Sequence, residues 1–146
     1  MINTKKIAVL SVAALLCIQT YAQKLQEKDV PVAVKSSLQK QYPIAKQVKW
    51  EKEGPNFEAE FKLDKVEYSV VYDELGNTTE TEVQIETGQL PSGILDYIKT
   101  NHANHKIKES AKITDAQGTF SYEVELKEME LLFNSNGGYL GTTKKD

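Results

Sequence analysis

The sequence predicts an α+β fold of two tandem repeats, each with one helix packed on a four-stranded antiparallel sheet. Apolar and polar residues alternate through Phe57–Ile85, and turn residues interrupt the alternation twice. This pattern is typical of antiparallel strands buried on one face. An apolar stripe with helical spacing precedes the segment, and the same order returns roughly 60 residues later. The two sheets are expected either to stay separate or to join into one broad surface.

A secretory signal peptide is predicted at residues 1–22. Two lysines precede an apolar run at residues 7–18, which is too short to span a bilayer comfortably, and Ala22 places a small residue before Gln23. The alternative is a lipoprotein signal with acylation at Cys17, but the large leucine before that cysteine disfavours it. We therefore expect a periplasmic or secreted protein that begins at Gln23.

The charge balance excludes one class of partner. The chain has a net charge of −3, and all 18 of its basic residues are lysines. Removal of residues 1–22 discards two lysines and no acid, which leaves a net charge of −5. Nucleic-acid binding depends on neutralising phosphates, so it is not expected. Without Cys17 the mature chain has no thiol. It also has no predicted membrane span.

Three segments are expected after the signal peptide: a loosely held polar lead at residues 23–29 and two repeats at residues 30–86 and 90–146. In the first repeat Pro31 favours a helix start, because its missing N–H costs nothing in the first turn. A residue before proline is pushed out of the α region, so Pro43 ends that helix.

Residues of the two repeats correspond in type. The apolar stripe of the first helix contains Val34, Leu38 and Tyr42, and a shift of 60 residues lays Ile94, Ile98 and His102 over them. Tyr122–Lys127 resembles Phe57–Lys62, and the Asn134–Gly138 turn resembles Asp73–Asn77. Repetition of the whole order supports the fold assignment more strongly than either half alone.

The residues of the first repeat carry a family resemblance. Its motifs are a helix beginning at Val30-Pro31 and ending at Tyr42-Pro43, then Val48-Lys-Trp, then Phe57-Glu-Ala-Glu-Phe, then Tyr72-Asp-Glu-Leu-Gly. They resemble the PepSY-like family of envelope proteins of Gram-negative type, which is also described as β-lactamase-inhibitor-like. The resemblance implies an exported protein of tandem helix-plus-sheet units, without established catalytic residues.

The sheet face opposite the apolar one is a candidate docking face for a basic protein or peptide. It carries charged residues of both halves: Glu58, Glu60 and Lys62, whose order recurs as Glu123, Glu125 and Lys127, together with Glu80 and Glu82. Charge of this kind sets the association rate and the orientation of a partner. The alternative is a solvated face with cross-strand Lys–Glu pairs.

Three further features have simpler interpretations. His102 and His105 are spaced as metal ligands on a helix would be, but a helix C-terminal turn also suits histidine. The Asp73–Asn77 segment is too short for a calcium loop, so it is expected to be a turn. The two hairpin tips remain candidate contact loops: Asp73, Glu74, Asn77, Asn134 and Asn136.

The sequence favours binding over catalysis, because it has no phosphate loop, nucleophile elbow or Cys/His pair. We expect a protein-binding module whose partner is an unidentified envelope protein or peptide, with enzyme inhibition as one form of that binding. The alternative is a carrier or sensor that holds a small ligand between helix and sheet. A third hypothesis is a metal-dependent hydrolase that uses His102 and His105. No cofactor is predicted.

Overall fold

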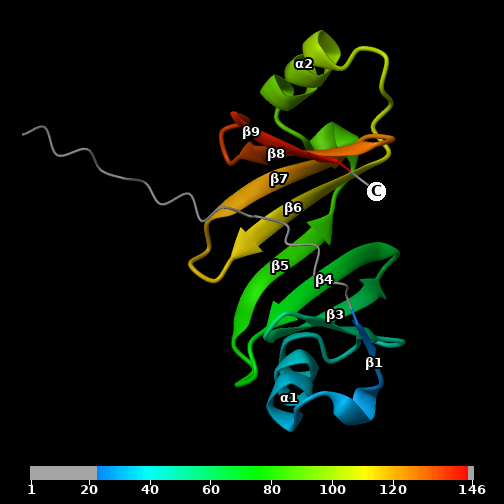
Figure 1. Cartoon of the computed structure of the whole chain (residues 1–146), viewed down its shortest axis with the longest axis vertical. Helices are drawn as coiled ribbons and strands as arrows, with labels where there is room; N and C mark the ends of the chain where they lie inside the picture. Colours follow the sequence, from blue (N-terminus) through cyan, green and yellow to red (C-terminus); the bar gives the residue numbers. More distant parts are fainter. Residues whose placement is uncertain (1–22, 145–146) are drawn as a thin grey trace, which may run out of the picture.

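The computed structural model of the chain describes residues 23–144, which form one antiparallel sheet and two α-helices (Figure 1). Each strand pairs with the next one in the sequence, so the sheet is a continuous meander of nine strands. The strands are β1 Gln23–Leu25, β2 Lys49–Glu53, β3 Asn56–Leu63, β4 Val66–Tyr72, β5 Thr78–Gln84, β6 Glu109–Asp115, β7 Phe120–Glu125, β8 Met129–Asn134 and β9 Tyr139–Lys144. The α+β prediction is therefore confirmed.

Of the two arrangements expected for the sheets, the joined one is found, because the strands of both repeats form a single sheet. Its junction lies between β5 and β6, where Glu80–Gln84 pairs with Ala111–Asp115. The backbone N–H and C=O groups at each edge of a strand can pair with a neighbouring strand, so β5 can pair with β6 as well as with β4. The element order of 3-10 turn, helix and four strands occurs twice along this sheet.

The two helices are α1, Val32–Gln41, and α2, Ser92–Asn101, and they lie at opposite ends of the long axis (Figure 1). Both begin directly after a proline. The proline ring holds φ of Pro31 and Pro91 near a helical value, at −54° and −52°. Their ψ angles of 143° and 139° are extended, so each helix starts at the next residue. Within residues 23–144 no helix is long and apolar enough to cross a membrane.

Each helix buries its apolar stripe on the same face of the sheet. Val34 and Leu38 of α1 pack in a core with apolar residues of β2, β3 and β4. Ile94 and Ile98 of α2 pack in a second core with residues of β7 and β8. The register places the apolar residues of β3, β4, β7 and β8 on the helix side, and the opposite side is left without a helix.

Residues 23–29, expected as a loosely held polar lead, form β1 and the 3-10 helix Glu27–Asp29 instead. Strand β1 pairs with β2, and Leu25 lies opposite Trp50 and packs against the first core. That apolar contact anchors an otherwise polar segment. The predicted signal peptide, residues 1–22, lies outside the described residues.

Three hairpins of the sheet close with the same local chemistry. The side chains of Asp73, Asp115 and Asn134 each accept hydrogen bonds from the backbone N–H groups two and four residues later, at 2.8–3.0 Å. A glycine follows each of these residues at the third position, with φ of +82° or +83°. Glycine adopts this conformation without the penalty that other residues meet. The predicted turn at Asp73–Asn77 is thereby confirmed.

Candidate docking groove

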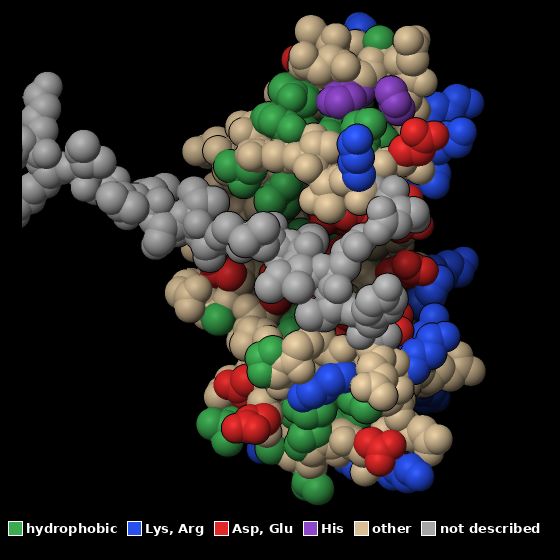
Figure 2. All heavy atoms as spheres, in the orientation of Figure 1, with side chains coloured by type: hydrophobic (Ala, Val, Ile, Leu, Met, Phe, Trp, Pro, Cys, Tyr) green, Lys and Arg blue, Asp and Glu red, His purple; other side chains and the backbone are tan. Residues whose placement is uncertain are grey.

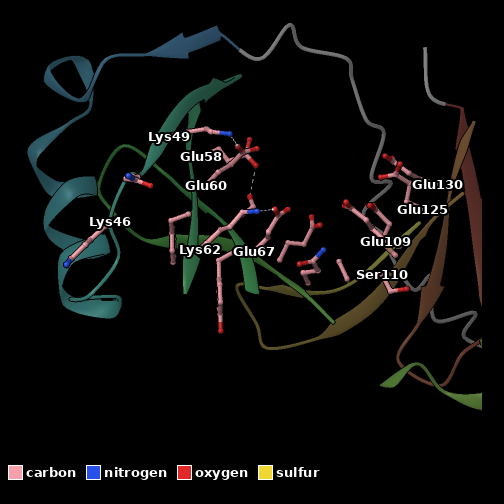
Figure 3. Close-up of a pocket in the computed structure, with 18 residues that line it drawn as sticks. Lys46, Lys49, Glu58, Glu60, Lys62, Glu67, Glu109, Ser110, Glu125 and Glu130 are labelled. Atoms are coloured by element: carbon pink, nitrogen blue, oxygen red, sulfur yellow. Dashed lines mark hydrogen bonds and ion pairs between the residues drawn. The ribbon is translucent and has the colours of Figure 1, made fainter. Parts of the chain in front are cut away.

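A groove of about 660 Å³ lies on the helix-free face of the sheet (Figure 3). Six strands, β3 to β8, supply most of its lining. The acidic residues that line it are Glu58, Glu60, Glu67, Glu82, Glu109, Glu123, Glu125 and Glu130. In Figure 3 the labelled carboxylates of β3 and β4 lie on one side of the groove, and those of β6, β7 and β8 lie on the other. The joining of β5 to β6 thus brings the acidic residues of both halves to one site.

Strand register explains why these carboxylates share a face. Glu60 pairs with Ser69, Ser69 with Glu82, and Glu82 with Ile113, so one row of side chains crosses β3 to β6. Successive residues of a strand point to opposite faces, so the apolar residues next to these glutamates point toward the helices. The alternation that builds the two cores therefore also builds the acidic face.

Glu82 lies on β5, the middle strand of the sheet, and its carboxyl group has the most perturbed environment of the groove. Burial, together with the negative charges of Glu123, Glu80, Glu58 and Glu130, raises its pKa to about 8. A carboxyl group with this pKa is largely protonated at neutral pH. The centre of the groove is therefore less negative than its number of glutamates indicates.

Two glutamates near Glu82, namely Glu58 and Glu80, are also half-buried. The hydroxyl of Ser69 donates a hydrogen bond of 2.5 Å to Glu58. Burial nevertheless raises the pKa of Glu58, and the nearby charges of Glu53 and Glu60 add to this effect. Burial likewise raises the pKa of Glu80. The groove thus collects carboxyl groups whose charged forms are poorly solvated.

Lysines pair with glutamates at the rim of the groove. Lys62 forms an ion pair with Glu67, and Lys49 lies 4.0 Å from Glu60. Lys108 lies 3.5 Å from Glu125. These lysine side chains are at least half exposed, so their pairs contribute little to folding stability. They leave the interior of the groove acidic.

Most of the predicted docking face lines this groove, namely Glu58, Glu60, Lys62, Glu82, Glu123 and Glu125. Glu80 lies on the same face, two residues before Glu82 on β5. Lys127 does not line the groove, because it follows the end of β7 in the turn to β8, where it lies 3.7 Å from Glu128. Whether these residues dock a partner stays a prediction.

The acidic face of the sheet also carries buried apolar residues that the alternation pattern did not reveal, and one of them, Ala111, lines the groove. Val71, Ala111 and Ile113 are at most 7% exposed, although the register places them on the acidic face. A signal for Val71 exists in the sequence, because Val70-Val71-Tyr72 is a run of consecutive apolar residues. Such a run indicates a strand buried on both faces.

The predicted hairpin tips are packed against the helices. A Cβ atom added at Gly76 would lie 2.7 Å from the backbone oxygen of Ala33 in α1. A Cβ atom added at Gly137 would lie 3.4 Å from the side chain of Ile94 in α2. The side chains of Asp73 and Asn134 accept hydrogen bonds from backbone N–H groups of their own turns. The turns that contain the predicted tip residues therefore pack against α1 and α2 through Gly76 and Gly137. Those residues are Asp73, Glu74, Asn77, Asn134 and Asn136.

The histidines lie at the end of α2, where Figure 2 shows them side by side. His102 is the C-cap residue, and its backbone N–H donates to the carbonyl oxygen of Ile98 at 2.8 Å. The ring centroids of His102 and His105 are 5.8 Å apart. Among residues 23–144 no three side chains of His, Cys, Asp or Glu are placed to hold a metal ion. The helix-end interpretation of His102 is confirmed.

Comparison with protein families gives two overlapping matches to one family. The family model described as "Putative beta-lactamase-inhibitor-like, PepSY-like" matches residues 16–80 and again residues 65–140. Together the two matches cover most of the chain. No curated protein matches the chain significantly.

Several solved structures from Bacteroides species share the fold. A "BLIP-like protein" from Bacteroides fragilis is 25% identical, with a TM-score of 0.58 over 77% of this chain and 84% of that one. A "DUF2874 family protein" from Bacteroides uniformis is 16% identical, with a TM-score of 0.70 over 78% and 88%. A protein from Bacteroides eggerthii described as "putative periplasmic" is 13% identical, with a TM-score of 0.73 over 79% and 88%. The predicted export agrees with the last description.

Proposed function

We propose that this chain, which belongs to the PepSY-like family, is a non-catalytic periplasmic module that binds a protein partner through the acidic groove. The observation that carries the proposal is the groove itself, on a sheet face that neither helix covers. Its residues come from six strands of one sheet, so the surface is rigid and broad. A rigid, preformed surface loses little conformational entropy when a partner binds.

The partner's contact surface is expected to be cationic. The acidic face combines clustered carboxylates with apolar side chains, because Ala111 lines the groove and Val71 and Ile113 lie on the same face of the sheet. Lysine and arginine suit such a surface, because their charged ends complement the carboxylates and their methylene stems pack on apolar atoms. Electrostatic attraction of this kind mainly raises the association rate and is weakened by salt.

A carrier or sensor for a small ligand is the second candidate, and the packing between helices and sheet speaks against it. A carrier would hold its ligand in a cavity between those layers. In the first core Val34, Val70 and Tyr72 have no exposed surface, and in the second core Ile94, Leu131 and Phe133 have none. These side chains fill the space that a ligand would need.

Enzyme inhibition is the form of binding that the family description suggests. The family model carries the words "beta-lactamase-inhibitor-like", and the Bacteroides fragilis protein is described as BLIP-like. An inhibitor needs a surface that excludes water from an enzyme's site. The single sheet face offers such a surface without a catalytic group of its own. The target enzyme, like any other partner, is identified by the binding experiment below.

We also infer that the two halves are copies of one unit of about 55 residues, preceded by a signal peptide that ends at Ala22. Each half follows the order 3-10 turn, helix and four strands. The equivalent core positions Val34 and Ile94 are both fully buried, and Leu38 and Ile98 are 7% and 5% exposed. Matching burial at matching positions supports a repeat of structure as well as of sequence.

The proposal is tested by charge reversal at the groove. Glu60 and Glu109 line the groove; Glu109 is exposed and the Glu60 side chain is 44% exposed, so the double variant Glu60→Lys/Glu109→Lys should fold normally. Half-buried Glu58 is unsuitable, because a lysine there would be poorly solvated. The control is Glu27→Lys/Glu128→Lys, which changes the net charge equally at exposed positions away from the groove.

Proteins captured from a periplasmic extract should bind the parent and the control alike, and bind the groove variant at least tenfold more weakly at physiological salt. The loss should appear mainly in the association rate. Equal binding by all three proteins would show that the acidic face is only solvated. Equal loss in both variants would show that net charge, and not the groove, governs binding.

A further inference from the structure

Among residues 23–144, the neighbours of Glu82 along its own strand and across the adjacent strands are not basic. Its row holds Ser69 on one side and Ile113 on the other, and its own strand continues with Glu80 and Gln84. The charged groups that act on it are Glu58 of β3, Glu80 of β5, Glu123 of β7 and Glu130 of β8, all of them acidic. Within residues 23–144 no hydrogen bond or ion pair to the Glu82 side chain is found.

The lysines of the groove are held elsewhere. Lys62 pairs with Glu67. Lys49 pairs with Glu60 and lies in the same row as Glu82, three strands away on β2. Lys46, the remaining lysine of the lining, precedes β2 at the same rim. A buried carboxylate without a cation is costly. The described residues supply no such cation to Glu82, so its carboxyl group either keeps its proton or receives a cation from elsewhere.

We propose that Glu82 is the anchor of the groove, which takes a lysine or arginine side chain of the protein partner in exchange for its own proton. This inference rests on the proposed function and specifies which residue pairs with the partner. In the free protein the carboxyl group is neutral. On docking, its O–H proton leaves to solvent, and the carboxylate that remains forms an ion pair with the incoming ammonium or guanidinium group. The raised pKa of Glu82 supports this exchange.

Apolar residues near Glu82 suit the stem of such a side chain. Ile113 lies directly opposite Glu82 on β6, and Val71 lies on β4 opposite Glu80. Both are buried. Because little of Ile113 and Val71 is exposed, a lysine that reaches Glu82 would pack its methylene groups on the apolar atoms of the groove lining and place its charge on the carboxylate. Because the pair would form in a poorly solvated place, it would be stronger than the rim pairs.

Proton release upon binding tests the exchange. The probe is an acetylated and amidated hexalysine peptide, whose ammonium groups stay charged between pH 6 and pH 8. Calorimetric titrations at pH 7 in two buffers of different ionisation enthalpy give the number of protons released. With a pKa of about 8, roughly nine in ten Glu82 side chains carry a proton at pH 7. The parent should therefore release up to about one proton more than Glu82→Gln does.

The affinity of the parent for hexalysine should also rise up to about fiftyfold from pH 6 to pH 8, because only deprotonated Glu82 pairs with the probe. Glu82→Gln should show a much smaller rise. The matched control Glu128→Gln, at an exposed turn position that does not line the groove, should keep both the proton release and the pH dependence of the parent. The isosteric change to glutamine leaves the packing intact.

The outcomes separate this inference from the proposed function. If hexalysine binds the parent and Glu82→Gln with equal proton release, the groove binds cations but Glu82 is not the anchor. If hexalysine does not bind at all, both proposals are wrong. If calcium chloride binds with proton release and hexalysine does not, the groove takes inorganic cations, and the proposed anchor is overturned. A carbon-13 titration of the free protein that finds the pKa of Glu82 near its ordinary value also overturns it.

Discussion

Replacement of Glu82 by glutamine should change how the stability of the protein depends on pH. The pKa of Glu82 is raised to about 8 in the folded protein, whereas an unfolded glutamate titrates near its ordinary value of 4.5. The folded state therefore binds more protons between these two values. The stability from protonated Glu82 is fully present below about pH 4.5 and is lost as the pH rises through 8. Glutamine mimics the protonated form at every pH.

The expected magnitude follows from the size of this window. Each pH unit inside it changes the free energy of unfolding by up to about 1.4 kcal/mol for one proton. Between pH 5.5 and pH 7.5 the parent should lose about 2 kcal/mol through Glu82. Glu58 and Glu80, whose pKa values are also raised, add to the slope in both proteins. The difference between parent and variant isolates Glu82.

Urea unfolding at several pH values measures this difference. Glu82→Gln should match the parent near pH 5 and exceed its stability by about 2 kcal/mol near pH 7.5. Glu128→Gln, at an exposed turn position outside the groove, should follow the parent at every pH. The reasoning is refuted if Glu82→Gln and the parent have parallel stability curves across this range, because Glu82 would then be ionised and well solvated.

Three further predictions concern the fold and its export. Leu38→Ala and Ile98→Ala should each lower the free energy of unfolding by about 2–5 kcal/mol, and a loss below about 1 kcal/mol at either would break the equivalence of the two helices. Gly76→Ala should cost more stability than Gly54→Ala, because both glycines have positive φ but only Gly76 faces the backbone of α1 within 3 Å; equal unfolding midpoints would contradict this contact. N-terminal sequencing of the exported protein should begin at Gln23, and recovery of a lipid-anchored form would overturn the predicted cleavage.

The fold was largely predictable, because each of its determinants is local in the sequence. Alternation fixes the strands and their faces, the prolines fix where the helices begin, and the Asp–Gly and Asn–Gly spacings fix the turns. The pairing of β5 with β6 was not predictable from these signals. It depends on contacts between the two halves that alternation leaves unspecified, since any exposed edge strand could pair there.

The glutamates of the groove were predictable, and their energetics were not. Sequence parity placed Glu82 and Glu123 on one face, but the burial of Glu82 depends on the closure of the two halves around it. Position in the sheet also separates Glu60, at an exposed rim, from Glu82, at the centre, although both follow the same pattern. The sequence pattern wrongly placed Lys127 on this face. Strand β7 ends at Glu125, so Lys127 lies in the turn that follows.

The location of a bound cationic segment tests the central claim most directly. A hexalysine peptide that carries a nitroxide label should broaden the methyl signals of Val71, Ala111 and Ile113, which lie on the acidic face of the sheet. The methyl signals of Val34 and Ile94, on the helix side of the sheet, should stay sharp. Broadening of the helix-side methyls with sharp groove methyls would contradict the account.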